Sequence, residues 1–169
     1  GAVSPLRTGS SLFMPFLAHS GEGSYRVVTD SLHSHLVKGC PMASVTSTDV
    51  QLADVTYRVH ATGSPGATAL LFLHGSGPGA TGTSNWKAVI EELGERYYCL
   101  APDMIGFGDS THPQGTPSGM KAFNLLQADT LWQLLDALGV QNAHLIGNSM
   151  GGMISIRMAL AQPERVETM

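Results

Sequence analysis

Residues 143–152 read Ala-His-Leu-Ile-Gly-Asn-Ser-Met-Gly-Gly, and this stretch decides the fold. The apolar run that ends at Ile146 is typical of a buried strand, and residues 150–161 suit a helix that Gln162-Pro163 ends. A G-x-S-x-G pentapeptide, Gly147 to Gly151, therefore lies on a sharp turn from strand to helix. The alternative is a simple tight turn without chemistry, and the flanking strand and helix argue against it.

Ser149 lies at the centre of this turn. A serine hydroxyl is a weak nucleophile unless a neighbouring base deprotonates it, and this turn holds the oxygen above the sheet. The turn strains the serine backbone and crowds its neighbours, so glycine is needed at Gly147 and Gly151. The Met150 N–H lies at a helix N-terminus, where it can donate to a developing oxyanion. We therefore predict Ser149 as the nucleophile and the Met150 N–H as one oxyanion donor.

Strands and helices alternate along the chain on both sides of this turn. The strand segments are continuous apolar runs, which are typical of strands buried on both faces. Such an alternation predicts an α/β domain with a mostly parallel sheet and helices on both faces, which the chain leaves incomplete. We predict two short antiparallel strands within 50–59, further strands at 69–73, 97–101, 143–146 and 165–169, and helices at 85–96, 121–138 and 150–161.

A glycine-rich loop, His74 to Gly79, follows the strand that ends at Leu73. Glycines let backbone N–H groups approach a ligand closely, and in this type of fold the second oxyanion donor comes from this position. We assign that donor to the Ser76 N–H, with Gly77 as a further contributor. His74 is expected to brace the loop by hydrogen bonds rather than to act as the base. A phosphate-binding loop is excluded, because no Gly-Lys-Ser or Gly-Lys-Thr follows.

A second turn, Asp103 to Ser110, follows the strand that ends at Ala101. Asp103 precedes Ser149, whereas in α/β enzymes with a serine turn of this kind the catalytic acid and the catalytic histidine both follow the serine in the sequence. We therefore interpret Asp103 as part of a hydrogen-bonded turn that shapes the floor of the pocket. His112 and His144 also precede the serine, and neither fits the role of the base.

Composition excludes several classes of function. The net charge of −4 provides no basic field for nucleic acid or an anionic membrane. No apolar stretch approaches the roughly 20 residues that cross a bilayer, and no secretory signal is recognisable, so we expect a cytoplasmic protein. Its two cysteines give no metal or disulfide pattern, and Cys99 lies in an apolar run that predicts a buried thiol.

The first 41 residues show no helical or strand period that persists beyond a few residues. Met42 precedes the first organised sequence, so residues 1–41 are interpreted either as a disordered leader or as upstream read-through. An ordinary N-terminal extension is the alternative. Residues 42–169 are expected to form the N-terminal part of an α/β core domain, without a cap and without the C-terminal part of the sheet.

Four segments taken together resemble the meta-cleavage product hydrolases, a family within the α/β-hydrolase superfamily. They are His74-Gly75-Ser76-Gly77-Pro78-Gly79-Ala80, Ser84-Asn85-Trp86, Asp103-Met104-Ile105-Gly106-Phe107-Gly108 and Gly147-Asn148-Ser149-Met150-Gly151-Gly152. These enzymes hydrolyse a carbon–carbon bond in 2-hydroxy-6-oxo-dienoates from ring-cleaved aromatics. The resemblance implies that Asn148 and Asn85 lie beside a small-molecule substrate, and an amide can both donate to and accept from a dienoate oxygen.

The resemblance also implies a mechanism without a metal or organic cofactor. A histidine promotes ketonisation, the carbonyl is attacked, and a carboxylic acid and a shorter dienoate leave. The triad acid, this histidine and the cap are expected beyond residue 169, so the chain by itself is expected to be inactive or nearly so. A homo-oligomer of the whole protein is possible in such a family. Two alternatives stay open: a carboxylesterase or lactonase of the same fold, and a non-catalytic binding protein.

Overall fold

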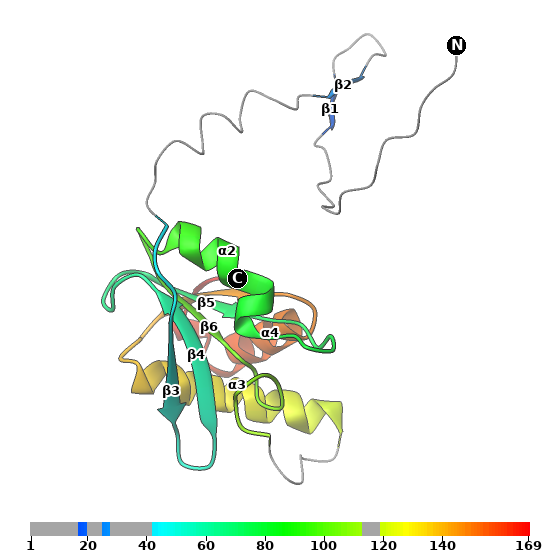
Figure 1. The fold of residues 1–169 in the computed structure, drawn as a ribbon. Helices are drawn as coiled ribbons and strands as arrows, with labels where there is room; N and C mark the ends of the chain where they lie inside the picture. Colours follow the sequence, from blue (N-terminus) through cyan, green and yellow to red (C-terminus); the bar gives the residue numbers. More distant parts are fainter. Residues whose placement is uncertain (1–16, 20–24, 28–41, 113–118) are drawn as a thin grey trace. The chain divides into compact units, whose positions relative to one another are not determined.

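The structure is a computed structural model that describes residues 17–19, 25–27, 42–112 and 119–169 (Figure 1). The chain divides into two units at residues 40 and 41. In the first unit, β1 (Leu17–His19) pairs antiparallel with β2 (Tyr25–Val27). Each strand has three residues, too few to contradict the expectation that no strand period persists beyond a few residues. Whether the segment is a leader stays a prediction.

The second unit is built on a six-stranded sheet with the order β3-β4-β6-β5-β7-β8 (Figure 1). β3 pairs antiparallel with β4 and β4 with β6, whereas β5, β6, β7 and β8 run parallel to one another. The strands span Thr46–Gln51 (β3), Thr56–Thr62 (β4), Ala69–Leu73 (β5), Tyr98–Pro102 (β6), Ala143–Gly147 (β7) and Val166–Thr168 (β8). The mostly parallel sheet confirms the predicted fold class, including the antiparallel pair at its start.

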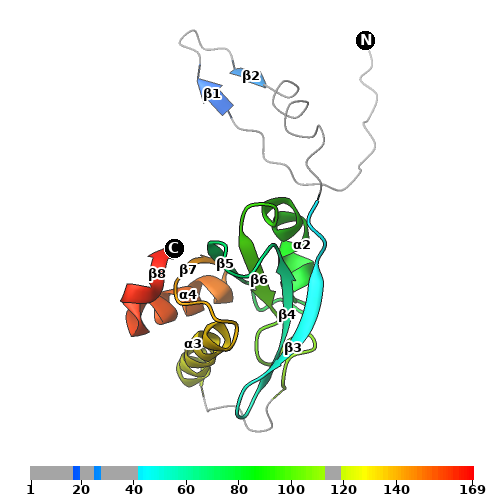
Figure 2. The same cartoon turned by 90° about the vertical axis from the view of Figure 1, so that its left-hand side faces the viewer.

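In the described residues of the second unit, three α-helices and one short 3-10 helix accompany the sheet (Figure 2). They are α2 (Gly82–Leu93), α3 (Met120–Ala137), α4 (Met150–Ala161) and η1 (Pro163–Arg165). The predicted bounds of α4 are confirmed. α3 begins and ends one residue earlier than the expected 121–138, and α2 begins and ends three residues earlier than the expected 85–96. Thr81 caps it: the Thr81 hydroxyl accepts from the Ser84 N–H at 2.9 Å, and the Thr81 N–H donates to Ser84 Oγ at 2.8 Å. In the described residues no helix is long and apolar enough to cross a membrane.

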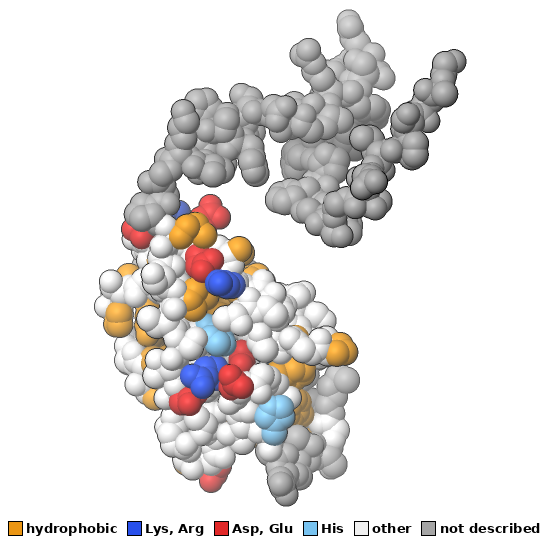
Figure 3. Space-filling model, viewed as in Figure 1, with side chains coloured by type: hydrophobic (Ala, Val, Ile, Leu, Met, Phe, Trp, Pro, Cys, Tyr) orange, Lys and Arg blue, Asp and Glu red, His pale blue; other side chains and the backbone are white. Residues whose placement is uncertain are grey.

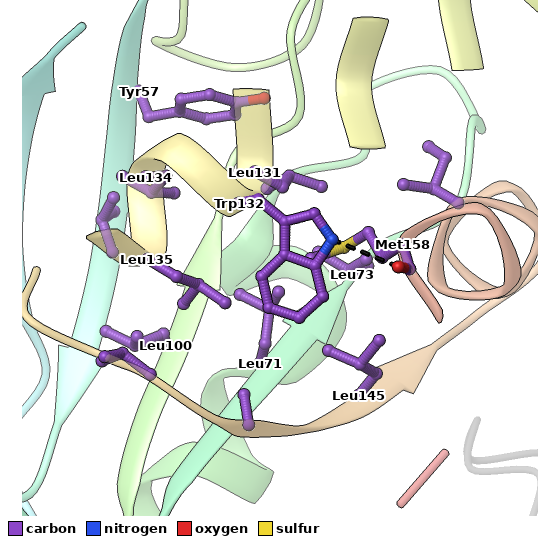
Figure 4. Close-up of a cluster of buried hydrophobic side chains, with 14 of the residues drawn as sticks. Tyr57, Leu71, Leu73, Leu100, Leu131, Trp132, Leu134, Leu135, Leu145 and Met158 are labelled. Atoms are coloured by element: carbon purple, nitrogen blue, oxygen red, sulfur yellow. Dashed lines mark hydrogen bonds between the residues drawn. The ribbon is translucent and has the colours of Figure 1, made fainter. Parts of the chain in front are cut away.

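Apolar side chains cover both faces of the sheet. On one face, α3 and α4 pack on β5, β6 and β7 around Trp132, whose indole N–H donates to the Met158 carbonyl at 3.2 Å (Figure 4). On the other face, Ile90 of α2 lies against Phe72 and Cys99. Burial on both faces explains why β5 is a continuous apolar run. Burial also raises the pKa of the Cys99 thiol, which confirms the expected core cysteine.

The direction of the chain reverses across β5, and this reversal positions the site. From β5 the chain crosses through α2 to β6 on one side, and then through α3 to β7 on the other side. The loops that leave the carboxyl ends of β5 and β7 therefore diverge, and parallel sheets bind their ligands in the crevice at such a point. The glycine-rich loop follows β5 and the serine turn follows β7, so the fold brings both predicted motifs to one edge.

Candidate active site

Ser149 has a strained backbone. Its φ of 53° and ψ of −111° make it the only non-glycine residue with positive φ in the described parts of the chain. Side chains avoid this region because Cβ meets the neighbouring carbonyl, and such residues are retained mainly where function requires them. Ser149 occupies the cap position before α4, yet its hydroxyl makes no capping hydrogen bond, and the residue is exposed. The hydroxyl is therefore presented outward, as the sequence predicts.

The glycines around Ser149 are required by close backbone contacts. A Cβ on Gly151 would lie 2.1 Å from the Leu73 carbonyl oxygen, and one on Gly147 would lie 2.4 Å from the Gly152 nitrogen. The Asn148 N–H also donates to the Leu73 carbonyl at 3.0 Å. The end of β5 therefore leaves no room for a side chain at Gly151, and the first turn of α4 leaves none at Gly147.

The glycine-rich loop lies directly beside the serine turn. A Cβ added to Gly75 would lie 3.5 Å from both Ser149 Cβ and Asn148 Nδ2. The N–H groups of Ser76, Gly77 and Met150 donate no hydrogen bond to other groups in the described part of the chain. All three thus remain available as donors, which is what an oxyanion site needs.

His74 braces the loop from below, as expected. The ring is fully buried; Nδ1–H donates to the Gly75 carbonyl at 2.7 Å, and Nε2 accepts from the Met104 N–H at 2.9 Å. Burial lowers the pKa of His74, opposed by the Gly75 hydrogen bond and the charge of Asp103. Both ring nitrogens are occupied, so this histidine is not placed to deprotonate Ser149.

Asp103 closes a hydrogen-bonded turn, which confirms this part of its structural interpretation, but no residue of the turn is among those that line the cavity over Ser149. Its Oδ1 accepts from the Gly82 N–H at 2.7 Å, and its Oδ2 accepts from the Asp109 N–H at 3.0 Å. The carboxylate thus lies at the N-terminus of α2, where the helix dipole favours negative charge. Ser110 Oγ donates to the Asp103 carbonyl at 2.6 Å and completes the turn.

Asn85 and Asn148 meet across the pocket although 63 residues separate them. Asn148 Nδ2 donates to Asn85 Oδ1 at 3.3 Å, and Asn85 Nδ2 donates to Ser84 Oγ at 3.1 Å. Sequence reasoning selected the two asparagines but missed Ser84, which supports one of them. The reciprocal Thr81–Ser84 cap was the signal that could have identified it.

A cavity of about 420 Å³ lies over these groups. It brings together five of the six predicted site residues, and the sixth, Met150, follows Ser149 directly. The lining contains no histidine, aspartate or glutamate within the described residues. The residues that line it are Gly75, Ser76, Gly77, Pro78, Gly79, Ala80, Ser84, Asn85, Asn148 and Ser149.

The fold and this serine turn define a family. Residues 68–169 match the model of the alpha/beta hydrolase fold family, and the chain belongs to that family. The 2-hydroxymuconate semialdehyde hydrolase of Pseudomonas sp. (strain CF600) is 41% identical over 97 residues, which are 57% of this chain and 33% of that protein. The chain thus spans about a third of the length of this curated relative.

Solved structures show the same architecture. The 2-hydroxy-6-oxo-6-phenylhexa-2,4-dienoate hydrolase of Rhodococcus sp. strain RHA1 superposes with a TM-score of 0.70 at 31% identity, covering 73% of this chain and 44% of that one. A bacterial membrane phospholipase A superposes with a TM-score of 0.63 at 35% identity, covering 72% of this chain and 37% of that one. The fold is therefore shared by proteins that are named as a dienoate hydrolase and as a phospholipase.

Proposed function

We propose that the whole protein hydrolyses a carbon–carbon bond in a 2-hydroxy-6-oxo-dienoate from the meta-cleavage of an aromatic ring. Ser149 is the nucleophile in this proposal, and its outward position on a strained turn is the observation that carries it. The names of the relatives at about 40% identity support the substrate class. Residues 42–169 supply the N-terminal part of the catalytic domain, and a cytoplasmic homo-oligomer is part of the same proposal, on sequence grounds alone.

The pocket provides two of the functions that this reaction needs. The N–H groups of Met150 and Ser76, with Gly77, face the negative charge that develops on the attacked carbonyl oxygen, and each such donor contributes about 10²–10³-fold to rate. The paired amides of Asn148 and Asn85 bind the oxygens of the dienoate. The base that deprotonates Ser149 is not among the pocket residues. In our proposal it comes from the part of the relatives' length that this chain does not span.

A chimera tests this function. Residues 42–169 are joined to the C-terminal two thirds of the CF600 hydrolase, and turnover of a 2-hydroxy-6-oxo-dienoate is followed by the loss of its visible absorption. We expect turnover that falls by about 10⁴-fold or more in the Ser149→Ala variant. Asn148→Ala and Asn85→Ala should mainly raise KM. A folded chimera without dienoate turnover, or one indifferent to Ser149→Ala, would contradict the proposal.

Ester or lactone hydrolysis is the second candidate, and the likeness to the phospholipase favours it. The same chimera is assayed with p-nitrophenyl acetate beside the dienoate. A kcat/KM for the ester that exceeds the value for the dienoate would reverse the order of the two candidates. The orientation of Ser149 argues against a binding protein without catalysis, because a binding role does not require the strained turn.

A further inference from the structure

A second serine, Ser47, belongs to a series of three side chains that are linked by hydrogen bonds. Ser47 Oγ lies 2.7 Å from His60 Nδ1, and His60 Nε2 lies 3.2 Å from Asp103 Oδ1. Ser47 is on β3, His60 faces it on β4, and Asp103 follows β6. A nucleophile hydrogen-bonded to a base that a third group orients is the arrangement that activates serine in hydrolases.

The surroundings of Asp103, His60 and Ser47 fix which group donates in each of the two hydrogen bonds. Asp103 is buried and its carboxylate accepts two backbone N–H bonds, so it is held as an acceptor for the His60 Nε2–H. A neutral His60 that donates from Nε2 presents the lone pair of Nδ1 to the Ser47 hydroxyl. The imidazole is thus oriented as a base toward Ser47.

Ser47 itself is exposed, whereas its two partners are buried. The face seen in Figure 3 carries histidine, basic and acidic side chains over β3 and β4. The charged side chains near His60 include Arg58 on the same strand. Arg58 pairs with Asp49 at 3.1 Å and with Asp109 at 3.8 Å. The three cavities described are lined by other residues, so an acyl donor would reach Ser47 at the exposed surface of β3.

We propose that Ser47 is a second acyl-accepting nucleophile, activated by His60 and Asp103, that takes acyl groups from activated esters. Ser47 Oγ forms a bond to the acyl carbon, and its proton passes to His60 Nδ1. The ester C–O bond breaks and the leaving group departs as an alcoholate or phenolate, which recovers the proton from His60 through water. This site does not depend on Ser149 or on the function proposed above.

The test acetylates the chain of residues 1–169 with p-nitrophenyl acetate and locates the acetyl groups by mass spectrometry. Trypsin releases residues 39–58, which contain Ser47 and also the exposed Ser44 as an internal control. General-base assistance contributes about 10²–10⁴-fold to such reactions. We expect Ser47 to acetylate about 100-fold faster than Ser44, because Ser47 has the oriented base. Equal labelling of the two serines would overturn the proposal.

Three further samples test whether labelling of Ser47 is independent of Ser149 and whether it requires His60 and the folded structure. Ser149→Ala should leave the Ser47 label unchanged, whereas His60→Gln should reduce it to the Ser44 level. A label on Ser47 that persists in folded His60→Gln, or that is lost in Ser149→Ala, overturns the proposal. Since His60 is buried and its replacement can unfold the domain, the unsubstituted chain is also labelled in urea above its unfolding midpoint. The advantage of Ser47 should vanish there, and its persistence would show that the folded relay is not the cause.

Discussion

Replacing Ser149 by glycine should stabilise the fold while it removes the nucleophile. At φ 53° and ψ −111° the serine backbone is in a region that glycine adopts freely. Strain of this kind costs about 1–3 kcal/mol. The hydroxyl makes no capping hydrogen bond and the residue is exposed, so its removal has no compensating loss.

The magnitude follows from two opposing terms. Relief of strain contributes about 2 kcal/mol, and the extra freedom of glycine in the unfolded chain offsets about 0.5–1 kcal/mol of it. The net gain in the free energy of unfolding is therefore about 1 kcal/mol. With a urea dependence of about 2 kcal/mol/M, the unfolding midpoint should rise by about 0.5 M.

Urea unfolding followed by tryptophan fluorescence measures this shift, because Trp132 is buried and bonded to α4. Ser149→Ala is the matched control: it also loses the hydroxyl but keeps Cβ, so its midpoint should stay near that of the unsubstituted chain. If Ser149→Gly is no more stable than Ser149→Ala, the turn stores no strain, and the main structural support for Ser149 as the nucleophile is lost.

Two further predictions concern the groups that surround the serine turn. Gly151→Ala places a Cβ 2.1 Å from the Leu73 carbonyl, which lies in a central strand and has no room to move, so the free energy of unfolding should fall by about 3 kcal/mol. Gly152→Ala, whose Cβ would have its nearest neighbour at 3.4 Å, should be neutral or stabilising by up to about 1 kcal/mol, and equal urea midpoints for the two variants would contradict the contact. His74 is buried with its pKa lowered from the ordinary 6.5, so the unfolded chain binds a proton near that pH that the folded chain does not. Stability should therefore be retained above pH 6.5 and lost as the pH falls below it, and His74→Gln should reduce this slope in unfolding curves recorded between pH 7.5 and 5; an unchanged slope would refute the assignment.

Much of the fold could be predicted because its signals are local. Continuous apolar runs such as residues 69–73 predict strands buried on both faces, and α4 was placed with its observed bounds. The start of α2 was wrong by three residues, because its cap is a reciprocal Thr81–Ser84 pair rather than the usual acidic capping box. The two short strands in the first unit were also missed, since three residues are too few to establish a period.

The candidate site also has residues that a local motif predicts and residues that only the fold brings together. Ser149 and its glycines were identified from a pentapeptide, because a strained turn has a local sequence requirement. The Asn85–Asn148 contact joins residues 63 positions apart, and here only the family resemblance placed both in one pocket. The sequence does not predict a site at Ser47 and His60, since neither residue belongs to a recognisable motif.

By itself, therefore, the sequence determined the serine turn, the glycine-rich loop and the order of buried strands, all of which depend on neighbours within a few residues. The tertiary structure alone decided which strands lie next to each other. That order turns the Asn85 amide toward Asn148 and buries His74 with both nitrogens occupied. It also aligns Ser47 on β3 and His60 on β4 with Asp103, which follows β6. The physical reason is that side-chain periodicity specifies which face of a strand is buried, but not which strand packs beside it.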